Sequence, residues 1–217
     1  HAANRLRGDH ALIARWIRPG SRVLDLGCGD GALLDHLRRE RAVTGYGVEI
    51  EVDKVVRCIE RGVSVIQGDL DAGLADFDNG SFDYVIMSLT LQAVYFPARV
   101  LDEMLRVGRE AIVAFPNFGH LSCRLQLGFG GHMPVSAALP ETWYETDNIH
   151  LCTIRDFESL CRQRGIRILQ RTVVNHQHRR SVGARLLANL LGEVALYRLE
   201  RGSKPTPHGA HHEANPA

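Results

Sequence analysis

The sequence contains no long apolar run. No stretch of about 18 consecutive apolar residues is present that would form a transmembrane helix, and no signal peptide opens the chain. We therefore expect a cytoplasmic protein without a membrane partner. A charge excess is also missing, because 26 Lys and Arg balance 25 Asp and Glu and leave a formal net charge of +1. Without a basic surplus, the sequence gives no electrostatic reason to expect a nucleic-acid partner.

Cysteine is scarce, and its spacing excludes two classes of small scaffold. There are five cysteines, an odd number, and no two of them form a C-x-x-C pair. This pattern favours a reducing compartment and argues against a disulfide frame or a zinc knuckle. We predict free thiols, mostly buried, at Cys28, Cys58, Cys123, Cys152 and Cys161.

The length and the apolar periodicity indicate one α/β domain. The chain has 217 residues, of which 45% are hydrophobic, enough for a single domain with a core of its own. Short β-branched runs alternate with helix-spaced apolar stripes, as in a parallel sheet covered by helices on both faces. Strands are predicted over 21–26, 44–50, 63–67, 82–87 and 110–115, separated by helices from Asp9 to Pro19 and over 30–38, 52–61 and 97–107. The helix over 52–61 would turn Val52, Val55, Val56 and Ile59 inward.

The second half of the chain begins with a break in this pattern. Residues 116–152 are rich in Gly, Pro and aromatic residues and predict an irregular insertion that serves as a lid or a partner-binding loop. Thr153 and Asp156 then form a capping-box-like helix start. A strand over 166–174, a short helix over 184–191 and a strand over 194–199 follow, the two strands forming an antiparallel hairpin. We predict one domain over 1–200 and a disordered tail over 201–217.

A glycine-rich turn after the first strand carries the clearest functional signal. Residues 23–31 read VLDLGCGDG, so the glycines follow a G-x-G-x-G pattern and not the G-x-G-x-x-G of a dinucleotide site. A pyrophosphate requires a bare, partly positive helix N-terminus, whereas Asp25 and Asp30 surround this turn with negative charge. A ligand with an ammonium and a sulfonium group fits better. Taken alone, such a turn is also compatible with a simple strand-to-helix connection.

Two further acids follow the next two strands. Glu49 ends the second strand and follows Asp25 at about the 20-residue spacing of acids that bind ribose hydroxyls. Asp69 follows the third strand, where its carboxylate can accept from an adenine amino group while the Leu70 N–H donates to the ring. A single acid at a strand end is usually solvated, but three acids at consecutive strand ends point into one crevice. They predict an adenosyl-ligand site.

Longer segments carry a family resemblance. Residues 24–31 (LDLGCGDG), with Glu49, Asp69 and 82–86 (FDYVI), resemble the class I S-adenosylmethionine-dependent methyltransferase fold. The likeness to the family of the methionine biosynthesis protein MetW is narrower and runs from about residue 6 to residue 197. It rests on residues 45–49 (GYGVE), 65–70 (VIQGDL), 91–94 (LQAV), 115–120 (FPNFGH) and 148–153 (NIHLCT).

The resemblance implies a fold, a cofactor and a partner. It implies a Rossmann-like class I methyltransferase fold with a mostly parallel seven-stranded sheet and helices on both faces. It also implies S-adenosylmethionine or S-adenosylhomocysteine as ligand, and a role in methionine biosynthesis as a protein partner that supports homoserine O-acyltransferase. Methyl transfer is implied by the fold alone, so a genuine methyltransferase acting on a small molecule stays the alternative. The predicted cofactor residues are Asp25, Gly27, Cys28, Gly29, Gly31, Glu49, Ile50, Asp69, Leu70 and Ser88.

The methyl-acceptor side offers few catalytic groups. Methyl transfer needs alignment of a nucleophile with the sulfonium and, for a hydroxyl or amine, a general base. Residues 87–90 (MSLT), after the fourth strand, contain no base. The long insertion contains His120, Glu141, Tyr144, Asp147 and His150, of which His120, His150 and Tyr144 are the catalytic candidates. The favoured explanation of these groups is that they are hydrogen-bond partners of loop backbone, and a partner surface that includes Trp143 is the remaining alternative.

A metal site is not predicted. His176 and His178 would share one face of an extended segment, but no third ligand accompanies them, so a solvated turn is favoured. The histidines of the tail, at positions 208, 211 and 212, indicate adventitious metal binding at most.

Overall fold

The computed structural model describes residues 8–174 and 188–202. Three predictions therefore lie partly or wholly outside the described residues. They are the solvated turn at His176 and His178, the first half of the helix over 184–191, and the tail from residue 203 onward.

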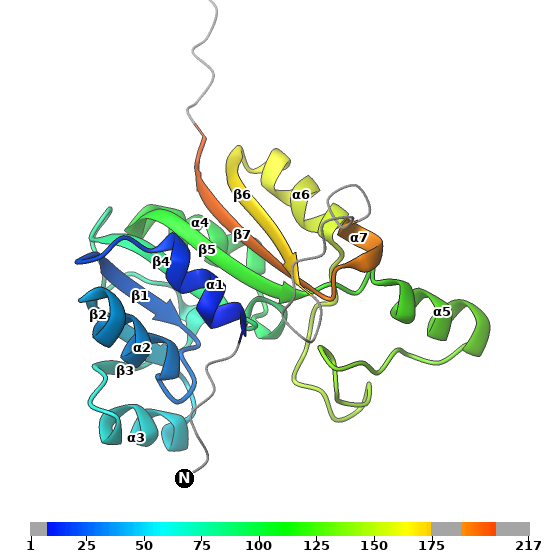
Figure 1. Cartoon of the computed structure of the whole chain (residues 1–217), viewed down its shortest axis with the longest axis horizontal. Helices are drawn as coiled ribbons and strands as arrows, with labels where there is room; N and C mark the ends of the chain where they lie inside the picture. The colour runs from blue at the N-terminus through cyan, green and yellow to red at the C-terminus, as the bar shows by residue number, and fades with distance from the viewer. Residues whose placement is uncertain (1–7, 175–187, 203–217) are drawn as a thin grey trace, which may run out of the picture.

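A seven-stranded sheet forms the centre of the molecule, in the order β3-β2-β1-β4-β5-β7-β6 (Figure 1). Strands β1 to β5 run parallel, and β7 is antiparallel to both β5 and β6. The predicted fold class and the closing hairpin are thus confirmed. The strands are β1 (Arg22–Leu26), β2 (Thr44–Glu49), β3 (Val65–Gln67), β4 (Phe82–Ser88), β5 (Gly108–Pro116), β6 (Ile166–Val174) and β7 (Val194–Arg201).

Helices cover both faces of this sheet, as the apolar periodicity predicts. Helices α1 (Gly8–Trp16) and α2 (Ala32–Arg41) lie on one face (Figure 1), where Ile13 and Leu37 pack in a cluster with Ile86. Helices α4 (Pro97–Val107) and α6 (Ile154–Gln163) cover the other face, where Leu101 and Phe157 join a second cluster. The start of α6 is a complete capping box between Thr153 and Asp156, as predicted.

Helix α3 (Val52–Glu60) differs from its prediction. Val52, Val56 and Ile59 were expected to face inward, but they are exposed, and Cys58 is the buried residue of this helix. The physical reason is that β3 is only a three-residue edge strand, which leaves little sheet for α3 to cover. The outer side of α3 therefore carries an unpartnered apolar stripe among the described residues.

The segment predicted to be irregular over 116–152 contains a helix. Helix α5 (Leu121–Gly130) begins at His120, whose ring nitrogen accepts from the Ser122 N–H, and ends at Gly131 with φ +65°. It projects away from the sheet (Figure 1), and Cys123 is its one buried residue. The residues from 131 to 152 are without helix or strand, as predicted.

The ends of the remaining elements differ slightly from the predicted ones. Strand β7 reaches Arg201, which pairs with Ile166, so the last strand is longer than predicted and extends into the predicted tail. A short helix, α7 (Ala188–Leu191), precedes it. Two 3-10 turns, η1 (Leu70–Ala72) and η2 (Leu91–Ala93), follow β3 and β4, and the sequence pattern had not indicated either of them.

Candidate functional site

A crevice of about 730 Å³ lies beyond the carboxyl ends of β1 to β4. Its lining comes from the turn after β1, the end of β2, η1, the segment after β4 and part of the long insertion. In an open α/β sheet this edge is where ligands bind. Of the three acids predicted to converge there, Glu49 and Asp69 line the crevice, whereas Asp25 is buried in β1 and does not.

The glycine turn after β1 forms the floor of the crevice. The N–H groups of Gly27 and Cys28 both donate to the Val48 carbonyl, which ties the turn to β2. Gly27 and Gly29 have φ angles of +69° and +58°, and both line the crevice. A Cβ at Gly27 would lie 2.5 Å from Thr90. Glycine is required here because this backbone conformation and this close approach both exclude a side chain.

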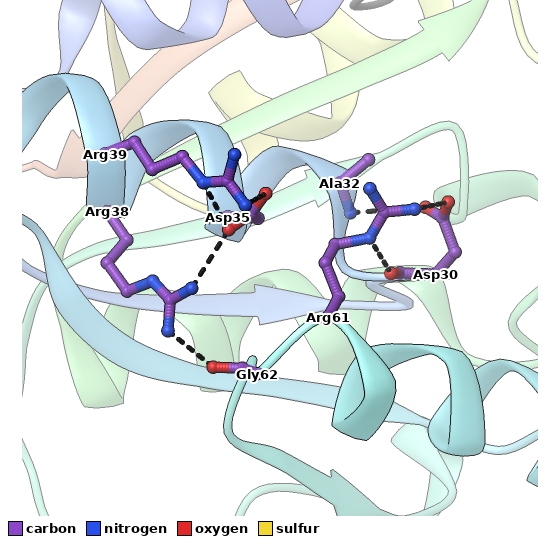
Figure 2. A network of polar contacts seen from close by, with 7 residues as sticks. All are labelled: Asp30, Ala32, Asp35, Arg38, Arg39, Arg61 and Gly62. Carbon is purple, nitrogen blue, oxygen red and sulfur yellow. Dashed lines mark hydrogen bonds and ion pairs between the residues drawn. The ribbon is translucent and has the colours of Figure 1, made fainter. Parts of the chain in front are cut away.

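An ionic network holds the turn from outside (Figure 2). Arg61, just after α3, donates to both the backbone carbonyl and the carboxylate of Asp30. Nearby, Asp35 accepts from Arg38 and Arg39, and Arg38 also donates to the Gly62 carbonyl. The predicted negative charge of Asp30 is therefore paired with Arg61 and does not line the crevice.

Glu49 is the central buried acid of the site. It is only 5% exposed, and its carboxylate accepts from three backbone N–H groups. Oε2 accepts from Gly29 at 2.8 Å, while Oε1 accepts from Ile50 at 2.9 Å and Glu51 at 3.1 Å. A carboxylate oxygen has two acceptor positions. Oε2 therefore retains a position that can accept from a hydroxyl group in the crevice.

Two acids around η1 shape the next side of the crevice. The Asp69 carboxylate caps η1 by accepting from the Asp71 N–H at 2.9 Å. The Asp71 carboxylate accepts from the N–H groups of Tyr95 and Phe96, at 2.9 and 3.0 Å. Asp71 thereby joins the turn after β3 to the segment after β4, and both carboxylates line the crevice.

Part of the long insertion closes the crevice from above. We call residues 138–149 the roof segment, because Ala138, Pro140, Glu141 and 147–149 all line the crevice. The roof reaches as far as α3. There the hydrogen bond to Glu51 raises the pKa of Lys54, and the charges of Glu49 and Asp147 raise it further. At its C-terminal end, the N–H groups of Ile149 and His150 donate to the Gln92 carbonyl.

The charge of the crevice is strongly negative. Lys54 is the one lysine or arginine among the described residues that line it. The carboxylates that line it belong to Glu49, Glu51, Asp69, Asp71, Glu141 and Asp147. A cleft lined by one sign of charge concentrates ligands of the other sign, so this crevice suits a ligand that carries positive groups.

Seven of the ten predicted cofactor residues line the crevice: Gly27, Gly29, Glu49, Ile50, Asp69, Leu70 and Ser88. Asp25, Cys28 and Gly31 do not. Asp25 is buried in β1, Cys28 lies 3.8 Å from the Cys58 sulfur, and Gly31 begins α2 with φ +74°. A Cβ on Gly31 would lie 3.0 Å from the Cys58 sulfur, so this glycine serves packing.

The sequence pattern missed several lining residues. Lys54 and Thr90 line the crevice, but the sequence did not indicate either of them as a site residue. A lysine on a helix and a threonine after a strand occur in most proteins and do not by themselves point to a binding site. Leu89 lies between Ser88 and Thr90 with φ +58°, a strained conformation for a residue that is not glycine. Strain of this kind gathers at ligand sites, but it is visible only in the backbone angles.

The three catalytic candidates are not brought together at the crevice. His120 caps α5, and Tyr144 is exposed and packs edge-on against Trp143. His150 lies against the Tyr95 carbonyl at 3.2 Å and lines a separate cavity. Glu141 and Asp147, also named from the sequence, do line the crevice.

That second cavity is apolar and lies beside the crevice. It measures about 250 Å³. Gln92 lines both spaces; its Nε2 donates to the Leu89 carbonyl, and its buried Oε1 has no hydrogen-bond partner. An apolar group can enter this cavity while Oε1 accepts from a polar group at its mouth. Its other walls are Leu91, Pro97, Phe115, Pro116, Leu139, His150, Leu151, Cys152, Asp156, Phe157 and Leu160.

The described part of the chain contains neither a metal-binding cluster nor a membrane-spanning helix. Within 8–174 and 188–202, no three His, Cys, Asp or Glu side chains are grouped so that they could hold a metal ion. Over the same residues, no helix has the length and apolar character needed to cross a bilayer.

Comparison with known families and proteins gives a consistent assignment. The family model described as "Methionine biosynthesis protein MetW" matches residues 7–199. A bifunctional methionine biosynthesis protein MetXA/MetW from Rhodopirellula baltica is 39% identical over 167 residues, covering 73% of this chain and 27% of the relative. A ubiquinone biosynthesis O-methyltransferase from Xanthomonas campestris is 38% identical over 107 residues, 46% of this chain and 44% of that protein. The chain thus spans less than half the length of either relative.

The solved structures agree on the fold. An S-adenosylmethionine-dependent methyltransferase from Mesorhizobium loti superimposes with a TM-score of 0.64 at 17% identity, over 89% of this chain and 98% of that one. At this level of identity the likeness concerns the fold alone.

Proposed function

The chain belongs to the MetW family of methionine biosynthesis proteins, and from this premise we propose that it binds S-adenosylmethionine or S-adenosylhomocysteine and supports a homoserine O-acyltransferase as a protein partner. The observation that carries the ligand proposal is the buried Glu49 carboxylate above a bare glycine floor. Its free acceptor position suits a ribose hydroxyl, and Asp69 suits an adenine amino group. The acidic lining suits the ammonium and sulfonium groups.

The partner proposal draws on two different observations. The relative from Rhodopirellula baltica joins MetXA and MetW in one polypeptide, and such joining keeps two proteins at high effective concentration. In addition, no histidine lies among the described residues that line the crevice. A ligand site without a histidine, the commonest general base, fits a protein that acts through association.

A methyltransferase is the second candidate, and the apolar cavity favours it. A cavity that meets the ligand crevice at Gln92 can hold the apolar part of an acceptor. The relatives named as ubiquinone biosynthesis O-methyltransferases match over about half of this chain. The cofactor would supply the activated methyl group, and this chain would orient an acceptor hydroxyl through Gln92.

One experiment separates these functions. The chain and the homoserine O-acyltransferase of the same organism are purified apart, and both adenosyl ligands are titrated into the chain by calorimetry. The acyltransferase rate is then measured with and without the chain. We expect ligand binding and a higher rate with the chain present. Binding without any effect on the acyltransferase, together with transfer of a labelled methyl group to a hydroxyl compound, would instead establish the enzyme. No binding of either ligand would refute the cofactor proposal.

A further inference from the structure

The long insertion exposes apolar side chains that nothing in the described part of the chain covers. We call residues 121–149 the arm; it comprises α5, the chain that follows it and the roof segment. Leu125 and Phe129 lie one helical turn apart on α5, and Trp143 and Tyr144 lie on the roof. Phe129 is 89% exposed and Trp143 72% exposed. Large apolar residues gathered on one projecting segment mark an interaction surface.

The roof segment carries different chemistry on its two sides. Glu141 and Asp147 line the crevice, whereas the two aromatic residues between them in sequence face solvent. The aromatic rings are held by a short turn, in which the N–H groups of Glu145 and Thr146 donate to the Thr142 carbonyl. A movement of the roof backbone relative to the crevice therefore also moves the aromatic pair.

The acidic side chains of the roof add to the negative charge of the crevice. Glu141 and Asp147 line the crevice together with Glu49, Glu51, Asp69 and Asp71, and Lys54, which feels the charge of Asp147, is the one lysine among the described lining residues. Like charges at such a site repel one another, and a cationic ligand relieves the repulsion. A bound ligand with positive groups would hold the roof in one position, so the docking surface would already be ordered when the partner arrives.

We propose that the outer side of the arm is the docking surface for the acyltransferase, and that the roof segment couples docking to the adenosyl ligand. This inference rests on the proposed function. S-adenosylmethionine should tighten the complex, and the acyltransferase should tighten ligand binding by the same factor, because coupling between two sites is reciprocal. S-adenosylhomocysteine lacks the sulfonium charge and should have the smaller effect.

The chemistry of the arm favours a protein as its occupant. Helix α5 carries one cationic residue, Arg124, whereas helices that bind membrane surfaces present several Lys and Arg. Aromatic residues such as Trp143 and Tyr144 commonly supply most of the binding energy at protein interfaces. The competing apolar face is the stripe of Val52, Val56 and Ile59 on α3, which is aliphatic and does not include the roof.

The test measures the dissociation constant of the complex between the full chain and the acyltransferase, without ligand and with each saturating adenosyl ligand. We expect S-adenosylmethionine to tighten it by about 5-fold or more. Trp143→Ala and Tyr144→Ala should weaken it by about 30-fold. Tyr46→Ala on β2 is the matched control, because Tyr46 is a half-exposed tyrosine away from the arm, and Ile59→Ala tests the stripe on α3. Binding of S-adenosylmethionine to each isolated variant shows that it is folded.

Each result decides one part of the inference. A dissociation constant that is the same with and without ligand would overturn the coupling and leave the proposed function standing. Equal losses in Tyr46→Ala and Trp143→Ala, or a loss confined to Ile59→Ala, would overturn the arm as the docking surface. Self-association of the chain alone that Trp143→Ala abolishes, or sedimentation with anionic vesicles, would assign the arm to another occupant. No association of wild-type chain with the acyltransferase under any ligand condition would refute the partner proposal itself.

Discussion

At the scale of single residues, the site depends on side chains that fill two roles at once. The Glu49 carboxylate holds the turn after β1 through the Gly29 N–H and retains an acceptor position toward the crevice. Asp30, which has the same charge and stands in the same motif, is instead paired with Arg61 outside the crevice. The difference between the two acids comes from their partners, which the motif does not specify.

Replacing the Glu49 carboxylate should weaken ligand binding. Glu49→Gln replaces one carboxylate oxygen with an NH₂ group, which donates hydrogen bonds and does not accept them. The variant therefore lacks a charged acceptor, either for a ribose hydroxyl of the ligand or for the Gly29 N–H. We expect S-adenosylhomocysteine affinity to fall by about 2 kcal/mol, or about 30-fold, measured by calorimetry. Glu110→Gln is the control, because Glu110 is paired with Arg198 near the start of β5 and does not line the crevice. Unchanged affinity in Glu49→Gln would contradict the assignment of this crevice.

The floor of the crevice allows a matched pair of glycine variants. Gly29 and Gly80 have φ angles of +58° and +64°, and a Cβ on either would meet nothing within 4 Å. Valine should therefore strain both positions alike and lower the melting temperature of both variants. Ligand affinity should fall only in Gly29→Val, since Gly29 lines the crevice and Gly80 does not. An equal loss of affinity in the two variants would mean that strain alone explains it.

At the scale of elements, caps explain which helices the sequence predicted well. Helix α6 starts with a Thr–Asp capping box, a motif that can be recognised in the sequence. Helix α5 starts at a histidine, contains Gly128 and Gly130, and buries one residue, so neither a cap signal nor an apolar period indicated it. Helix α3 had a clear apolar stripe but no sheet wide enough to bury it.

Removal of the α6 cap should cost measurable stability. Thr153 accepts from the Asp156 N–H and donates to the Asp156 carboxylate. Thr153→Ala should lower the free energy of unfolding by about 1 kcal/mol, a fall of about 2 to 4 °C in melting temperature for a domain of this size. Thr153→Ser keeps the hydroxyl and should restore nearly all of it. If both variants melt like the wild type, the capping box contributes nothing to stability.

At the scale of the whole molecule, the core protects the thiols. Four of the five cysteines are buried and Cys152 is half-buried, and all five are free, as the sequence predicted. Burial raises the pKa of Cys152 to about 12 and that of Cys161 to about 11, and it also raises that of Cys28. Since the thiolate is the reactive form, these groups are almost entirely protonated and unreactive at pH 8.

Alkylation measures this protection directly. Iodoacetamide at pH 8 should add no label to the native protein over minutes, by intact mass, and should label all five thiols after unfolding in guanidinium chloride. A rise of pH toward 11 should speed labelling first at Cys152, which is half-buried, and not at Cys161, which is fully buried as long as the fold persists. Rapid labelling of native protein at pH 8 would show that the core opens far more readily than its packing indicates.

The sequence by itself determined the succession of the strands and of the helices other than α5, the glycine turn, the acids at three strand ends and the family. These features depend on local periodicity, on turn chemistry and on short motifs, which act between residues near one another in the chain. Only the tertiary structure decided that Asp25 is buried while Lys54, Asp71 and the roof segment line the crevice. It also decided that α3 and α5 leave apolar residues uncovered. Such outcomes depend on which distant segments meet, and a local pattern contains no information about its neighbours in space.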